Sequence, residues 1–158
     1  MNVPKVKYFA DVVVGEMLPT TEIVVTLTSF IVYAAATWDF HRYHYDDAFV
    51  KRIGLPAPFM DGQMIGALLA RELMNWGGPD AFVRRLRYRQ RAMVYVDDMI
   101  VVSGKVTGVT AEDGRTHAQC LLSVMKPNGT LVVRDALATV ELGRKGGVGV
   151  TASARSCR

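Results

Sequence analysis

Side chains able to carry out acid/base chemistry gather between residues 39 and 47. Asp39 and His44 are the pair of interest, because an imidazole changes protonation near neutral pH and a carboxylate can orient it or share a water with it. Their spacing would place them about 140° apart on a helix, so they can meet only in a loop. The polar and aromatic composition of the stretch favours a loop. A turn residue and a surface histidine would look the same, so both interpretations stay open here.

A second candidate for chemistry is the pair Asp61-Gly62 at the start of an apolar stretch. A helix beginning there would offer unpaired backbone N–H groups and a positive dipole end. Aimed at a carbonyl oxygen, such a helix end can stabilise developing negative charge. Gly62 would let a ligand approach the backbone closely. The alternative is structural, since Asp is a common helix N-cap.

The helix that begins at Asp61-Gly62 is predicted to run to about Trp76 and to end at Gly77-Gly78. It is apolar almost all round, which predicts a helix wrapped by other structure rather than laid on a surface. Its strongly polar residues are Gln63, Arg71, Glu72 and Asn75.

Shorter elements are predicted before this helix. Residues 20–27 alternate like a strand, and Thr28 can cap a short buried helix over residues 29–38. Asp46 or Asp47 can cap a second short helix that ends at Gly54. Prolines at 56 and 58 then predict an extended connection into the long helix.

Four strands are predicted to follow as a β-meander, over residues 82–94, 99–109, 115–125 and 131–142. Alternate residues of the last three strands form one apolar face that can wrap the long helix. The expected fold is therefore α+β, a single domain over residues 1–142 with an antiparallel sheet around a central helix. Residues 143–158 are glycine-rich and without periodicity, and are predicted to be a disordered tail.

The composition of the chain argues against several classes of protein. The chain has 158 residues and a net charge of +4, without a nucleic-acid-binding motif or an apolar run long enough to span a bilayer. Cys120 and Cys157 lie in unlike contexts, which predicts neither a disulfide framework nor a metal site. No signal peptide is recognisable. We therefore expect a protein of a reducing compartment, the cytoplasm.

The order of these motifs resembles the MaoC-like dehydratase family, which includes R-specific enoyl-CoA hydratases. That family has an Asp and a His five residues apart in a loop, then Ala, Gly-[Phe/Leu]-Pro, and His-Gly opening the central helix. The resemblance covers about residues 8 to 142. The matching segments are Tyr8–Asp11, Val14–Glu16, Asp39–Asp46, Ala48, Gly54–Pro56, Gly62 and Val94–Asp98.

The resemblance implies a hot-dog fold and a thioester hydratase/dehydratase. Asp39 and His44 would manage water and protons at C2–C3 of a 2-enoyl or 3-hydroxyacyl thioester, most simply an acyl-CoA. The N–H of Gly62 would bind the thioester oxygen. It also implies a homodimer or an assembly of dimers, and no cofactor beyond the coenzyme A of the substrate.

Several residues are tentative substrate contacts: His41, Tyr43, Asp61, Arg87 and Arg89. Alternating arginines at 85, 87, 89 and 91 would line one strand face, either as a solvated or inter-subunit face or as a wall for coenzyme A phosphates. His41 and Arg42 stand where the family usually has Asn and Pro, and Asp61 where it usually has His. Two alternative functions therefore stay open, a hot-dog acyl-thioesterase and a non-catalytic subunit of a hydratase complex.

Overall fold

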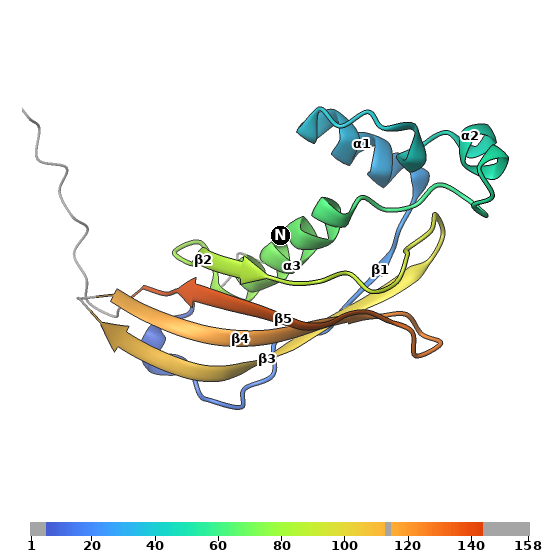
Figure 1. Ribbon diagram of the computed structural model, residues 1–158. Helices are drawn as coiled ribbons and strands as arrows, with labels where there is room; N and C mark the ends of the chain where they lie inside the picture. Colours follow the sequence, from blue (N-terminus) through green and yellow to red (C-terminus); the bar gives the residue numbers. More distant parts are fainter. Residues whose placement is uncertain (1–5, 113–114, 144–158) are drawn as a thin grey trace, which may run out of the picture.

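The fold is a curled five-stranded antiparallel sheet with a long helix across one face (Figure 1). The computed structural model describes residues 6–112 and 115–143. The strands are β1 (Thr21–Val24), β2 (Phe82–Arg87), β3 (Met99–Glu112), β4 (Arg115–Met125) and β5 (Leu131–Glu141). The helices are α1 (Leu27–Thr37), α2 (Asp47–Arg52) and α3 (Gly62–Gly77), with 3-10 turns η1 (Phe9–Asp11) and η2 (Arg42–His44).

The strand order β1-β3-β4-β5-β2 confirms the predicted antiparallel sheet but corrects its connectivity. Only β3, β4 and β5 form a meander, whereas β2 returns to the far edge and pairs with β5. The strand predicted over residues 82–94 ends at Arg87, and only Gln90 forms an isolated bridge beyond it. Alternation along a sequence predicts a strand but not its neighbours, and here α3 crosses the sheet before β2 begins.

The core lies between α3 and the apolar face of the sheet. The predicted alternation is confirmed, because Ile100 and Val102 of β3, and Cys120 and Leu122 of β4, are buried together. Burial raises the pKa of Cys120 to about 12, so this thiol is a core side chain rather than a nucleophile.

The prediction that the sheet wraps around a central helix is confirmed, and in this single chain the sheet covers one side of α3. Ile65, Leu69 and Leu73 are fully buried, but the opposite side leaves Ala67 and Met74 exposed, Met74 at 48%. One sheet covers only one side of a helix, so further apolar surface of α3 is available to a partner.

The N-terminal elements differ slightly from the prediction. Thr26 rather than Thr28 caps α1, in a reciprocal capping box with Ser29, so β1 ends earlier than expected. The second short helix is capped by Asp46, as predicted. Gly143, expected to open the tail, accepts the N–H of Phe9 at 3.0 Å. The rest of the predicted tail lies outside the described residues.

Figure 1 shows α1, α2 and the chain between them gathered beyond the N-terminal end of α3. The sheet curls beneath α3, and α1 and α2 lie on the side of the molecule where α3 begins. This arrangement brings the polar stretch of residues 39–47 to the start of α3.

Candidate active site

Three side chains far apart in sequence converge at the start of α3. One carboxylate oxygen each of Asp39 and Asp61 and one ring nitrogen of His44 all lie within 4.8 Å of one another. Asp39 follows α1, His44 ends η2, and Asp61 is the N-cap of α3. The predicted meeting of Asp39 and His44 is thus seen in the geometry, and Asp61 joins them. We call these three residues the Asp39–His44–Asp61 cluster.

Asp39 is placed by the way α1 ends. Trp38 closes the helix in the left-handed conformation, with φ of 60°, and Asp39 donates its N–H to the carbonyl of Ala34 at 3.0 Å. A non-glycine residue in this conformation costs about 1 kcal/mol, and the turn it makes redirects the chain toward α3. The carboxylate then accepts the N–H of His41 at 3.3 Å, in a local turn that leaves its other oxygen for the cluster.

His44 is held in one tautomer. Its Nδ1 lies 2.8 Å from the carbonyl oxygen of Phe59, which can only accept, so Nδ1 carries the proton and donates it. In the neutral ring Nε2 then has a free lone pair. The ring also packs edge-on against Phe59, with centroids 5.4 Å apart. An imidazole oriented through one nitrogen and available at the other suits general acid/base work.

Asp61 is both an N-cap and a member of the cluster. Its Oδ1 accepts the N–H of Gln63 at 2.8 Å. Its Oδ2 is buried and has no hydrogen-bond partner among the described residues. The structural interpretation, Asp61 as an N-cap, is therefore confirmed, while ligand binding at this helix end stays a prediction.

The N–H of Gly62 is the free donor at this helix end. Asp61 takes the next two N–H groups, that of Gln63 with its side chain and that of Met64 with its carbonyl. Within the described part of the chain the N–H of Gly62 has no acceptor. It can therefore bind a carbonyl oxygen next to the cluster.

Tyr33 and Tyr88 also lie at this site, although no pattern in the sequence assigned them a role. Burial raises the pKa of Tyr33, and the charges of Asp61 and Asp39 raise it further. Burial also raises the pKa of Tyr88, with a further contribution from Asp61, so both hydroxyls stay protonated. Tyr88 could have been recognised from its position between Arg87 and Arg89, because successive residues of an extended chain point to opposite faces.

Tyr88 and Gly66 fit one another closely. The Tyr88 hydroxyl donates to the carbonyl oxygen of Gly62 at 2.9 Å, and a Cβ added at Gly66 would collide with that hydroxyl and with two ring carbons. We expect Gly66→Ala to displace the ring and to lower the free energy of unfolding by about 1–3 kcal/mol, which denaturant unfolding would measure. Gly108→Ala is the matched control, because a Cβ added there meets only Gln119, at 3.6 and 3.7 Å. Unchanged stability of Gly66→Ala would contradict this packing.

His41 and Tyr43 serve the loop in this geometry. Their rings stack with centroids 4.2 Å apart, and His41 caps η2 by accepting the N–H of Tyr43. Tyr43 also stacks on Phe59, at 5.6 Å. His41 lies 6.3 Å from His44, ring to ring, and is exposed. A substrate contact by either residue stays a prediction.

The arginines lie apart from the cluster. Val83 and Leu86 of β2 pack on the core, so Arg85 and Arg87 point to the other face of the sheet. There they line a cavity of about 320 Å³ with Leu137 of β5. Arg89 lies beyond β2 and is exposed. Contact of Arg87 and Arg89 with coenzyme A phosphates stays a prediction.

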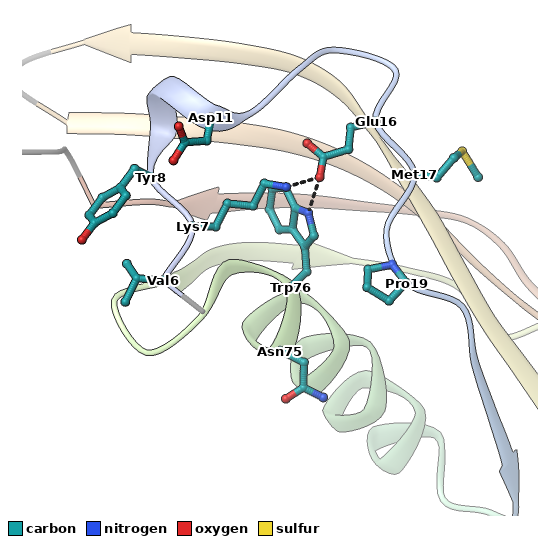
Figure 2. Close-up of a pocket in the computed structure, with 9 residues that line it drawn as sticks. All are labelled: Val6, Lys7, Tyr8, Asp11, Glu16, Met17, Pro19, Asn75 and Trp76. Atoms are coloured by element: carbon teal, nitrogen blue, oxygen red, sulfur yellow. Dashed lines mark hydrogen bonds and ion pairs between the residues drawn. The ribbon is translucent and has the colours of Figure 1, made fainter. Parts of the chain in front are cut away.

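A larger cavity, of about 560 Å³, lies at the C-terminal end of α3 (Figure 2). Its polar groups already pair, because Lys7 and the Trp76 indole, at 3.1 Å, both donate to Glu16. Burial raises the pKa of Glu16, but the hydrogen bonds from Lys7 and Trp76 outweigh it and hold that pKa below its usual value. This network fastens the N-terminal segment to α3.

The sheet curled around α3, with an acid/base cluster at the start of that helix, defines a hot-dog protein with a polar site. The family model for the MaoC like domain matches residues 10–125. The chain therefore belongs to the MaoC-like family, as the motif order predicted.

A curated relative is the beta subunit of the 3-oxo-4,17-pregnadiene-20-carboxyl-CoA hydratase of Mycobacterium tuberculosis, which is 29% identical over 82% of this chain and 95% of its own length. The ChsH1–ChsH2 complex from the same organism is similar in structure, with a TM-score of 0.68 and 28% identity over 84% of this chain and 98% of that one. R-hydratase PhaJ1 from Pseudomonas aeruginosa has the same fold, with a TM-score of 0.79 and 19% identity over 87% and 86% of the two chains.

No helix in the described part of the chain is long and apolar enough to cross a membrane. The cytoplasmic location stays a prediction.

Proposed function

We propose that this chain adds water to 2-enoyl thioesters and removes it from 3-hydroxyacyl thioesters, most simply acyl-CoAs. The observation that carries the proposal is the convergence of Asp39 and His44 beside the free N–H of Gly62. Two of the relatives described above are named as hydratases or subunits of one, which agrees with this reaction class.

The reaction needs both the Asp39–His44 pair and the N–H of Gly62. The water oxygen bonds to C3, one of its protons passes to the Asp39–His44 pair, and the pair returns a proton to C2. The C2–C3 double bond becomes single, and the thioester oxygen carries the transient negative charge, which the N–H of Gly62 stabilises. One water is added overall, so the step needs no cofactor.

We propose further that a second hot-dog subunit covers the exposed sides of α3 and α1, where Met74, Ile31 and Val32 are open to solvent. A homodimer is the simplest assembly, because closed two-fold pairs are the commonest oligomers. The named relative is one subunit of a hydratase, which makes a different second chain the alternative. Sedimentation at micromolar concentration tests the homodimer, and a monomer would contradict it.

Crotonyl-CoA and a longer or ring-bearing enoyl-CoA test the reaction. Loss of the enone absorbance without free thiol is the expected result. Free thiol with the enone retained would overturn the hydratase proposal in favour of the thioesterase. Neither change for the chain alone, together with hydration by its complex with a native partner that survives loss of Asp39 and His44, would leave the non-catalytic subunit as the answer.

A further inference from the structure

Oδ2 of Asp61 is a buried oxygen that needs a hydrogen-bond donor. Oδ2 is buried and has no partner among the described residues, while Oδ1 is fully used in capping α3. A buried acceptor left unsatisfied is costly, and native structures rarely retain one unless a water or ligand supplies the donor. The N-cap role needs only one oxygen and does not explain why the second is buried in a residue that lies against Asp39 and His44.

None of the described residues donates a hydrogen bond to Oδ2. The Asp39 carboxylate is an acceptor, and His44 directs its Nδ1–H to the carbonyl oxygen of Phe59. Tyr88 gives its hydroxyl proton to the carbonyl of Gly62. A water molecule fits between these side chains, because it can give one proton to Oδ2 and the other to the Asp39–His44 pair.

We infer that Asp61 is a third binding group for the reacting oxygen, with Oδ2 accepting the O–H that stays on that oxygen throughout the reaction. This inference rests on the proposed hydratase function. Of the two protons of the water, one passes to the Asp39–His44 pair and the other remains and becomes the proton of the 3-hydroxyl group. Asp61 holds the remaining one, so no bond to Asp61 forms or breaks.

This role has an asymmetric kinetic consequence. The enoyl substrate has no hydroxyl, so in hydration Asp61 touches only the water and affects kcat rather than the KM of the enoyl thioester. The 3-hydroxyacyl substrate does present its hydroxyl to Oδ2, so in dehydration Asp61 affects KM. The losses of kcat/KM in the two directions must be equal, because the variant cannot change the equilibrium between substrate and product.

Asp61→Asn is the sharpest variant. Asn caps helices as well as Asp does, and its carbonyl oxygen must face the N–H of Gln63 to do so. The amide NH₂ then takes the place of Oδ2 and presents a donor where an acceptor was. We expect kcat for hydration to fall roughly 10- to 100-fold, the range for a hydrogen bond to a charged group, with the enoyl KM unchanged. In dehydration KM should rise by the same factor.

Asp47→Asn is the matched control. Asp47 is an exposed carboxylate that pairs with Lys51, and its replacement should leave kcat and KM unchanged for both hydration and dehydration. Wild-type kinetics in Asp61→Asn would overturn the inference and leave Asp61 as a cap. A raised KM for the enoyl thioester would overturn it too, since Asp61 would then act on the thioester. Activity lost on chelation and restored by Zn²⁺ would equally overturn it, because the same three side chains would then hold a metal ion.

Calorimetric binding separates this inference from the proposed function. Wild-type protein should bind 3-hydroxybutyryl-CoA more tightly than butyryl-CoA, roughly tenfold or more, and Asp61→Asn should lose that preference. Equal binding of the two ligands by wild-type protein overturns the role of Asp61 even if hydration is observed. A preference that depends on Asp61 in a protein without turnover supports the hydroxyl contact while overturning the hydratase.

Discussion

Replacing His44 by Ala or Asp39 by Asn is expected to lower kcat/KM for enoyl-thioester hydration by about 10³-fold. General acid/base groups typically contribute about 10²–10⁴-fold, and in the proposed mechanism these two act on the same water. Because they act as a unit, the double variant should be little worse than either single one. The rate at which enone absorbance is lost, measured over a range of substrate concentrations, gives kcat and KM. Neither side chain belongs to the buried core, so thermal unfolding should change little.

His117→Gln serves as the matched histidine control, because His117 lies in β4 and its Nε2 faces Glu141, at 3.8 Å, rather than the cluster. It should keep wild-type kinetics. A fully active double variant of Asp39 and His44 within the native assembly would show that another chain carries the reaction, and this chain would then be the non-catalytic subunit.

Replacing Gly62 by Pro is expected to remove the thioester-oxygen site while leaving the fold intact. Proline is well tolerated at the first position of a helix, and Asp61, with φ of −59° and ψ of 136°, already has the conformation that a following proline requires. The substitution deletes one N–H. Loss of an oxyanion donor typically costs about 10²–10³-fold in kcat, and we expect a loss of that size here.

Gly62→Ala is the control for this variant, because alanine adds a Cβ but keeps the N–H. That Cβ would lie 3.1 Å from Oε1 of Gln90, the mobile end of a side chain that can shift. Gly62→Ala should therefore keep most of the activity. If Gly62→Pro folds normally and retains full kcat, the thioester oxygen is bound elsewhere.

The local structure was largely predictable from the sequence. The limits of α3 followed from Asp61-Gly62 and Gly77-Gly78, since a capping side chain and glycines mark helix ends by local chemistry. Strand β4 was predicted residue for residue, because its alternation is uninterrupted. That Asp39 and His44 lie in a loop, and so can meet, also followed from composition.

The relations between distant segments needed the tertiary structure. That β2 pairs with β5, and that a side of α3 stays uncovered, depend on how α3 crosses the sheet, which no periodicity encodes. Arg87 and Tyr88 are adjacent in sequence but lie on opposite faces, and only packing shows which face meets the site.

Asp61 shows which properties of a residue follow from its neighbours in the chain and which depend on the tertiary structure. The sequence by itself determined that it starts a helix, because capping is a contact between neighbours in the chain. It could not determine where the second oxygen points, since that depends on Asp39 and His44, which a separate loop brings to the same place. Backbone chemistry over a few residues thus decided the elements and that Asp39 and His44 lie outside a long helix, while long-range packing decided that a second carboxylate joins them.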